Sequence, residues 1–557
     1  MALVTQEKLK QLYSQAQDYK GDIRESYNET FELTDPFFKI ADSGKKESLE
    51  RRKIDSTVLV SQRFLCNFIM TSLFSRSGSW AMLKTNPTAY KEINKADGEV
   101  AQDTIEALNK LMEKNSNIVY EVNETTNYYT ETAKALMDSL RVGTGVRKTV
   151  VLASRSKPLT YEYINLDNFY YLEDSFGHPT ITFKVHTEKT LSQLNDMFGH
   201  IKGWKKPDSL ESEEDLKKTI NVIESVIPDF KESDSTVTYY HTVHTEGFEE
   251  ICLEEVLKYQ PFRVFRWGTD SSNPWGIGIG RENTDLLKDL EDYKSKRNKH
   301  MDKIVNPPIN WRGNIDLMYK ASLEPGEINY AGDGLSGEND LGVQPINLGT
   351  NLLPVEQDIA DARQRIREIY MAQPLGDVLD TKNRSATEMS LRHEMFRKEF
   401  SGAYELLNTE LLQPTFMDAY IILQEKGLLD DYTTVDENTA NNKYLEFSQI
   451  IYLNELTKSA GREEVMNAVS WYQINAELTE ESRRKYLMNI PKFNRWSAEK
   501  MKVPLDLIPP TKEVEEAMKR EDMIAQLTQL GQVQNEGLQP QVQEIAGGMN
   551  VGQQREI

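Results

Sequence analysis

Residues 284–308 read TDLLKDLEDYKSKRNKHMDKIVNPP, and residues 354–372 read PVEQDIADARQRIREIYMA. In the first segment apolar side chains recur every three or four positions, which predicts an amphipathic helix over 284–305 that ends before the prolines. The second segment has the same spacing and predicts a helix over 355–372, opened by Pro354. The sequence therefore predicts two helices of similar length around an irregular, glycine-rich insert.

A third helical pattern follows a short loop, residues 374–384, that we expect to be exposed. Ser385 and Glu388 form a capping box at its start. The pattern continues to Lys426, with Pro414 predicted to kink the helix and Gly427 to end it. For the insert between the first two helices, two interpretations stay open. It gains order by pairing with a neighbouring chain, as edge strands do, or it is a mobile surface loop.

The remaining pattern is mixed and predicts an α+β fold that is mostly helical. Helices are expected over 1–35, from the N-cap Asp55 onward, over 97–141 with a split at 115–117, over 208–225, and over 440–525. Strands are expected at 80–83, 146–152, 161–164, 169–172, 181–186, 236–244 and 262–267, with a four-residue hairpin connection at Asp174-Ser-Phe-Gly177. The alternation in 262–267 predicts a half-buried strand. From residue 526 we expect a poorly packed, Gln- and Gly-rich tail.

Composition excludes several classes. The 557 residues carry a formal net charge of -22, which argues against a DNA-coating protein with a basic face. Cys66 and Cys252 are the only cysteines, so we expect neither a disulfide framework nor a zinc site. We expect the protein to reside in a reducing compartment. Residues 1–20 lack the apolar core of a signal peptide, and the run 58–74 is too polar to span a bilayer. We expect a soluble, intracellular chain.

Several fragments resemble catalytic motifs but lack a required residue. Arg147 precedes Lys148 where a phosphate loop needs glycine, and Gly276-Ile-Gly-Ile-Gly280 departs from a dinucleotide loop, so a tight turn or close backbone approach is the better interpretation. His393-Glu394 has Arg397 where a zincin has its second histidine. The insert also contains the acidic residues Asp333, Glu338 and Asp340. They are weak evidence for a metal site, because acidic residues are frequent throughout this chain. We predict no catalytic residue, no metal site and no cofactor.

Taken in order, the motifs resemble the head-to-tail connector, or portal, of short-tailed (podovirus-type) phages. The resemblance is carried by Arg24, Tyr27, Asp35-Pro36, Ile54-Asp55-Ser56-Thr57, Trp80, Gly143-Thr-Gly145, Asp174-Ser-Phe-Gly177, Leu191-Ser-Gln-Leu194, Phe198-Gly199, Pro261-Phe262, Arg266-Trp267, Trp275-Gly276, Asn306-Pro307-Pro308, Pro325-Gly326-Glu-Ile-Asn329, Arg384-Ser-Ala-Thr-Glu388 and Glu410-Leu-Leu-Gln-Pro414. It covers residues 20–430, and the last 120 residues match less clearly.

The resemblance implies a portal fold with wing, stem, clip and crown. It assigns 1–283 to the wing, 284–306 and 351–372 to two stem helices, 307–350 to the clip, 373–385 to a tunnel loop, 386–430 to a long wing helix, 431–525 to crown helices and 526–557 to the tail. It places Asp377, Asp380, Lys382 and Arg384 in the DNA-facing tunnel loop. It places Trp311, Arg312, Tyr330 and Ile346 in the clip, where terminase and tail adaptors dock.

The implied assembly is a ring of twelve copies at a capsid vertex of the virion, assembled in the host cytoplasm. Its implied partners are non-specifically held double-stranded DNA, the terminase large subunit, major capsid and scaffolding proteins, and tail adaptor or tail tube proteins, with no membrane. Two rival functions stay open. One is another ring-forming tail adaptor of the virion, and the other is a metal-dependent nuclease or hydrolase that uses the acidic clusters.

Overall fold

The computed structural model describes residues 5–37, 54–74, 76, 78–86, 100–208, 218–229, 237–305, 309–311, 343–345, 352–372, 400, 402–431, 448–453, 455–479, 487–503, 520 and 523. The chain divides into two compact units, Met1–Leu456 and Thr457–Ile557. Each unit is described by itself.

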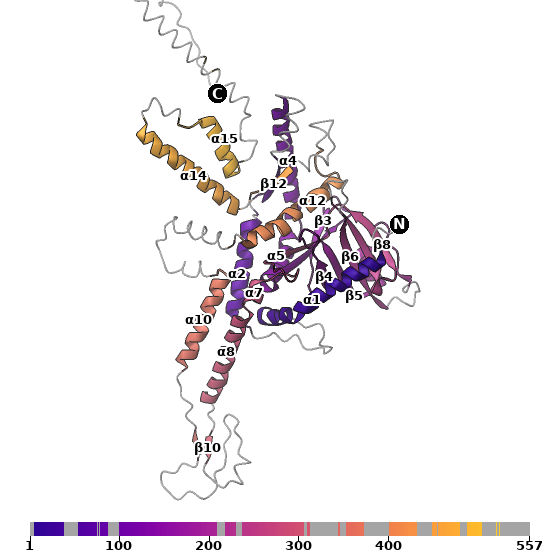
Figure 1. The fold of residues 1–557 in the computed structure, drawn as a ribbon, viewed down its shortest axis with the longest axis vertical. Helices are drawn as coiled ribbons and strands as arrows, with labels where there is room; N and C mark the ends of the chain where they lie inside the picture. Colours follow the sequence, from indigo (N-terminus) through magenta and orange to yellow (C-terminus); the bar gives the residue numbers. More distant parts are fainter. Residues whose placement is uncertain are drawn as a thin grey trace, which may run out of the picture. The chain divides into compact units, whose positions relative to one another are not determined.

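Two antiparallel sheets of three or more strands lie in the first unit, beside two two-stranded ladders (Figure 1). The larger has the order β4-β5-β6-β7-β8, with strands Phe169–Leu172, Ile181–Thr190, Thr219–Asp229, Thr238–Thr245 and Ile251–Leu257. The smaller has the order β3-β2-β9, with strands Leu159–Tyr163, Thr144–Val151 and Phe262–Arg266. The prediction of a mixed helix and sheet fold is confirmed.

Strand β6 corrects a prediction. The expected helix over 208–225 is wrong from Thr219 onward, because this segment pairs with β5 on one side and β7 on the other. Its isoleucines and valines fit the pleated surface of a central strand. Strand β8 was not predicted. The hairpin of β4 and β5 is confirmed, but the strands end at Leu172 and begin again at Ile181, so the turn at 174–177 sits within a longer connection.

Helix α1 (Gln6–Thr34) lies along the sheets (Figure 1). Its buried residues, among them Leu9, Ala16, Ile23 and Tyr27, recur at helical spacing. Lys20 fixes the helix to the segment before β4 by donating to the carbonyls of Leu166, Asp167 and Phe169 at 2.6, 2.5 and 3.2 Å.

The largest apolar cluster lies among helices α2 (Ser56–Leu73), α4 (Val100–Glu124), α5 (Tyr128–Val142) and α12 (Gln413–Glu425). Trp80 stands between α5 and α12, with its ring centroid 6.5 Å from Tyr128 and 5.9 Å from Phe416. Next to it, β1 (Ala81–Thr85) pairs with β12 (Ser448–Tyr452). The prediction that 440–525, and with it the expected crown 431–525, is helical is therefore wrong at 448–452, where a strand completes this ladder.

The split predicted at 115–117 lies ten residues too early. Helix α4 continues to Glu124, and α5 begins at Tyr128. Asn115 and Ser116 can favour turns by bonding nearby backbone. Here Ser116 donates to the Met112 carbonyl of its own helix at 2.6 Å, and both residues also make tertiary contacts. The Asn115 amide donates to the Tyr420 hydroxyl at 3.1 Å, and the Ser116 hydroxyl accepts from the Leu83 amide at 3.1 Å.

Strand β9 is buried at all five positions, so the prediction of a half-buried strand is wrong. Its two arginines meet acids in the third helical segment predicted from the sequence, residues 385–426. Arg263 pairs with Asp418 of α12, and Arg266 binds Glu410 with both its backbone amide and its guanidinium. Glu410 lies in a π-helical turn, Asn408–Leu412, which ends just before Pro414. The expected kink at Pro414 takes the form of this π-helical turn. Proline has no amide hydrogen to donate and its ring clashes with the carbonyl four residues earlier, and the extra residue of the turn accommodates both effects.

Glycines bring two backbone segments into direct contact. Gly143 ends α5 with a φ of 104°, and a Cβ on Gly276 would lie 2.1 Å from the Gly143 carbonyl oxygen. Gly278 and Gly280 approach the same α5 terminus, and a Cβ added to either would lie within 3 Å of backbone. The prediction of a close backbone approach at 276–280 is confirmed. Short helix α7 (Ile279–Glu282) leads into the helix predicted over 284–305.

The second unit contains α14 (Glu455–Leu478, which begins two residues before the boundary) and α15 (Ile490–Met501). Gly461 of α14 lies against the backbone of Lys500, and Glu464 pairs with the Lys500 ammonium at 2.5 Å. Asn489 caps α15 by accepting from the Lys492 amide. The expected tail, 526–557, lies outside the described residues.

The glycine contact predicts a sharp difference between two Gly→Ala substitutions. Gly276→Ala should lower the stability of the first unit by about 2–4 kcal/mol, because the added methyl group would overlap the carbonyl group of Gly143. Gly21→Ala, in α1 with open space around it, should raise stability by about 0.5–1 kcal/mol. Thermal unfolding midpoints measure both. Equal midpoints for the two variants would contradict the close approach.

Candidate functional site

A buried carboxylate joins the two helices predicted around the insert. These are α8 (Thr284–Val305) and α10 (Leu353–Ile369), which confirm the two predicted helices within two or three residues at their ends. Asp55 accepts from the Thr57 amide at 2.8 Å and so caps α2 as predicted. Its other oxygen receives Lys294 of α8 at 3.0 Å and Arg363 of α10 at 2.9 Å. Three helices thus meet at one charge.

The electrostatics of this joint favour the ionised carboxylate. Burial by itself would raise the pKa of Asp55, whose side chain is 1% exposed. The bonds from Arg363, Thr57 and Lys294 outweigh burial and hold that pKa well below its usual range. The joint is therefore charged at neutral pH, with two cations on one anion.

Below this joint α8 and α10 lie side by side and continue away from the sheets (Figure 1). Leu287 and Leu290 of α8 are buried, as are Ile359, Ala362 and Ile366 of α10. Beyond them the chain forms a short antiparallel ladder of β10 (Ile309–Trp311) and β11 (Val343–Pro345). The two ends of the insert therefore pair with each other. We call α8, α10 and this ladder the arm.

A second polar site lies between the two sheets. Glu224 of β6 is fully buried, and Lys148 of β2 reaches its two oxygens at 2.6 and 2.8 Å. His186 bonds one oxygen at 2.9 Å and His241 bonds the other at 2.8 Å. Both carboxylate oxygens are occupied by protein donors. Lys148, which the sequence excluded as a phosphate-loop lysine, is thus an ion-pair partner.

His241 is held as a cation in this cluster. Its two ring nitrogens face carboxylates, Nε2 on Glu224 and Nδ1 on Glu255 at 2.6 Å, so both must carry protons to donate. Burial alone would lower the pKa of His241, but the two carboxylates outweigh burial and raise it. For Glu224, burial alone would raise the pKa, but the Lys148 ammonium and the bonds from His186 and His241 outweigh burial and hold it well below its usual range.

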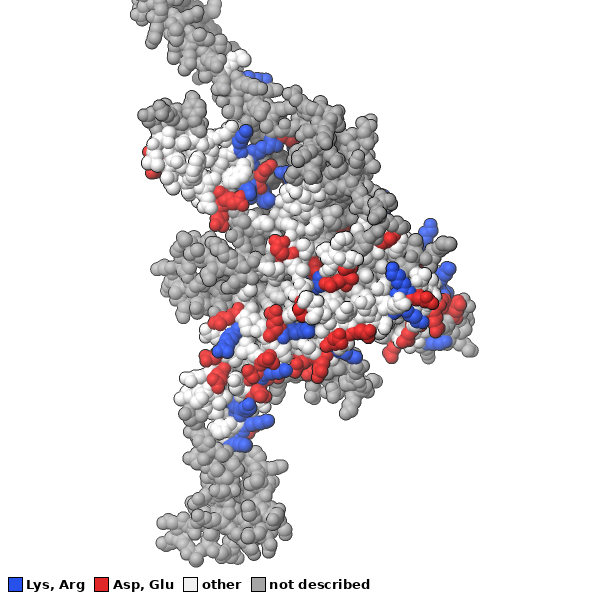
Figure 2. Space-filling view, viewed as in Figure 1, with Lys and Arg blue, Asp and Glu red and all other residues white. Residues whose placement is uncertain are grey.

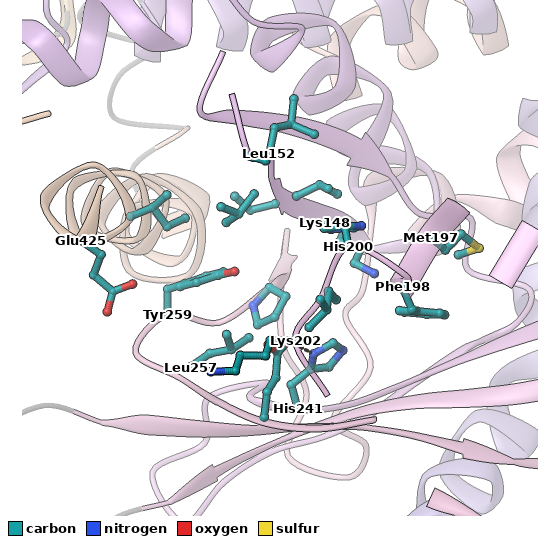
Figure 3. Close-up of a pocket in the computed structure, with 18 of the residues that line it drawn as sticks. Lys148, Leu152, Met197, Phe198, His200, Lys202, His241, Leu257, Tyr259 and Glu425 are labelled. Carbon is teal, nitrogen blue, oxygen red and sulfur yellow. Dashed lines mark hydrogen bonds and ion pairs between the residues drawn. The ribbon is translucent and has the colours of Figure 1, made fainter. Parts of the chain in front are cut away.

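A cavity of about 400 Å³ opens beside this cluster (Figure 3). Lys148 and His241 line it, with Tyr259 and Glu425 on one side and Met197 and Phe198 on the other. Both oxygens of Glu224 are already bonded by Lys148, His186 and His241 of the cluster. In the described part of the chain no group of three or more His, Cys, Asp or Glu side chains could hold a metal ion.

The two cysteines are chemically quiet. Both are free and buried. Burial raises the pKa of the Cys66 thiol to about 11 and that of Cys252 to about 12, which keeps both protonated at neutral pH. Of the helices that the structure describes, none has the length and apolar character needed to cross a membrane.

Comparison with known proteins gives the family. Residues 6–508 match the family described as bacteriophage head to tail connecting protein. The chain belongs to this connector family. No curated protein matched. Among solved structures, a chain of the virion of a native gene transfer agent particle is similar at 12% identity over 76% of this chain and 98% of that chain. The TM-score of this match is 0.28.

Most of the connector residues named from the sequence lie outside the described part of the structure. Trp311 lies in β10. Arg312, Tyr330 and Ile346 of the expected clip lie outside the described residues, as do Asp377, Asp380, Lys382 and Arg384 of the expected tunnel loop and His393-Glu394. The joint at Asp55 was not predicted from the sequence. The position of Arg363 in the sequence could have predicted this joint. Arg363 lies next to Ala362 on the apolar stripe of α10, where a cation needs an anion as its partner.

The joint predicts how the connector chain responds to substitution and to pH. Asp55→Asn keeps an N-cap but removes the charge, and should cost about 2–4 kcal/mol because Lys294 and Arg363 lose their anion. A carboxyl with a depressed pKa contributes stability above the pKa of the unfolded chain, about 4, and loses it as the pH falls further. The difference in thermal midpoint between wild type and variant should therefore be large at pH 7 and shrink below pH 4.

Asp18→Asn, an exposed acid on α1, is the matched control and should leave the midpoint within about 1 °C of wild type at pH 7. An Asp55→Asn variant as stable as this control would show that the three helices do not depend on the charge.

Proposed function

We propose that this connector chain is the portal subunit of a short-tailed phage. Twelve copies form a ring at one capsid vertex of the virion, through which terminase packages double-stranded DNA and the DNA later leaves. The observation that carries the proposal is the arm: two amphipathic helices fixed at Asp55 and joined at the far end by a two-strand ladder. Such a pair is suited to stand beside its copies around a channel.

In this proposal α8 and α10 are the stem and residues 307–350 are the clip. The terminase large subunit and the tail adaptor or tail tube proteins dock on the clip, through Trp311, Arg312, Tyr330 and Ile346. Residues 1–283 and 386–430 form the wing, 431–525 the crown, and 526–557 a tail. The capsid and scaffolding proteins contact the assembled ring. The chain acts as a structural channel without catalysis, which the saturated cluster at Glu224 supports.

The acidity of the chain suits this role. Each copy has a formal net charge of -22, so a ring of twelve copies has a total charge of about -264. A channel wall of this sign repels the phosphates of DNA and lets the DNA slide. Dense basic contacts would act as brakes, because each neutralised phosphate adds affinity by counterion release. The tunnel loop 373–385 combines Asp377 and Asp380 with Lys382 and Arg384, so its few cations touch the backbone only transiently.

The assembly itself is the first test. Purified chain should form rings with a central hole in top views by negative-stain electron microscopy, and native mass spectrometry should give a mass of twelve copies of 64.1 kDa. A chain that stays monomeric at every concentration and ionic strength would contradict the portal proposal. Hydrolysis of DNA or nucleotides that depends on a divalent metal would favour the nuclease instead.

Lys382→Ala/Arg384→Ala tests the contact with DNA. Removing both cations leaves the loop with Asp377 and Asp380, so DNA should be held less well while ring formation is unchanged. Packaged DNA per particle and its retention after packaging measure the effect. Lys8→Ala, at an exposed position of α1, serves as a control for lost charge. Normal packaging and normal retention in the double variant would rule out these residues as the main DNA-facing cations.

A further inference from the structure

The sign of the exposed charges on the arm depends on the helix and on the height along the arm, measured from the joint at Asp55. Lys294 and Arg363 both reach Asp55, so these positions of α8 and α10 lie at one height. Because the two helices run in opposite directions, residues after Lys294 lie level with residues before Arg363 (Figure 1). At about 1.5 Å per residue, Lys299 and Asp358 lie about 7.5 Å below the joint, each five residues from it.

Below the joint the exposed charges of α8 are mainly basic and those of α10 are acidic. They are Lys296, Lys299 and Lys303 on α8, and Glu356, Asp358 and Asp361 on α10. Above the joint the signs are reversed, with Asp285, Asp289 and Asp292 on α8, and Arg365 and Arg367 on α10. Three exposed residues depart from this sorting, namely Asp302, Glu368 and Lys288, the last of which pairs with Glu29 of α1.

The arm thus has two tiers, and within each tier the two helices carry opposite net charge. Figure 2 shows the basic group at the far end of α8.

The lysines of the lower tier are not used to join the two helices of one chain. Lys296 lies 3.6 Å from Asp292 of its own helix, a pair in which both side chains are 71% exposed. Among the described residues no ion pair joins Lys299 or Lys303 to an acid of α10. On α8 the three lysines follow one another at three and four residues and share one face. That face is turned away from Leu287 and Leu290, which pack inside the arm.

We propose that the two tiers are the contact between neighbouring copies, α8 of one chain against α10 of the next, and that they fix the register of that contact. The inference rests on the ring proposed above. A cyclic assembly joins two different faces of the same chain, and rotation about the ring axis keeps each tier at its own height. Acid therefore meets base in both tiers.

The pattern also rejects wrong arrangements of these two faces. If α10 of the neighbour were inverted, acid would face acid above the joint and base would face base below it. A slip of about ten residues, roughly 15 Å along the arm, would bring like charges together as well. Exposed pairs are individually weak and screened by salt. Their role is to select orientation and register, while packed apolar area supplies the affinity.

Charge reversal at one level tests the contact. Lys299→Glu and Asp358→Lys each place like charges across every interface, so each variant alone should assemble about fivefold less readily per interface at low salt. Mixed in equal amounts, the two variants should assemble again. Where they alternate around a ring, the glutamate introduced at position 299 of one variant meets the lysine introduced at position 358 of the other, and the next interface is wild type. Native mass spectrometry of variants with different isotope labels should show rings with equal numbers of both.

Controls separate the possible outcomes. Lys8→Glu and Asp18→Lys make the same charge changes at exposed positions of α1 and should not affect assembly, alone or mixed. Thermal midpoints of the separated chains should match wild type, and Lys296→Glu with Asp361→Lys provides a second pair at another level. The defect of each single variant should shrink as the salt concentration rises.

Single variants that form rings as readily as wild type at low salt would overturn the proposal. So would restoration in the double variant Lys299→Glu/Asp358→Lys without restoration in the mixture, since that result places the pairing within one chain. If wild type forms no ring at all, the portal proposal fails and this inference falls with it. If wild type forms rings that ignore these reversals, only the register inference fails.

Discussion

The structure of the first unit depends on one buried anion. Asp55 caps α2, holds α8 through Lys294 and holds α10 through Arg363, a residue 308 positions away. A carboxylate without these donors would be costly to bury, and the two cations would lack a partner if it were removed. The charge thus sets where the arm leaves the core. Helix propensity alone could make α8 and α10, but it could not place them at a common height.

Other cations in the core are also paired with carboxylates. The buried or half-buried cations Lys148, Arg263 and Arg266 each pair with a carboxylate on another element. Arg147 lies between the rings of Tyr128 and Tyr161, at 4.7 and 4.5 Å from their centroids. Each of these three pairs is neutral, so the net charge of -22 is carried by the other charged residues of the chain. This supports the proposed channel, whose wall needs few attractive contacts with DNA.

The sequence predicted what depends on local periodicity and on backbone chemistry. Helices α1, α8 and α10, the caps at Asp55 and Gly427, and the close approach of Gly276 were all visible in short windows, and Gly427 does adopt a φ of 63°. Errors arose where a distant partner decides. Asn115 and Ser116 have the composition of a turn, but their bonds to other elements keep α4 intact. Arg263 and Arg266 imitate the polar face of a strand until Asp418 and Glu410 bury them.

The ladder between β1 and β12 has a consequence for how the chain is made. Ala81 pairs with Tyr452, and Asn115 bonds a carbonyl 315 residues further along the chain. The helical core therefore cannot close until nearly the whole first unit has left the ribosome, roughly 15–65 s after α4 at ~5–20 residues per second. During that interval the apolar faces of α4 and α2 lack α12 and α10, the later helices that pack on them. Copies that met before the ladder formed would associate through these faces, so ordered assembly must wait for the synthesis of each chain to finish.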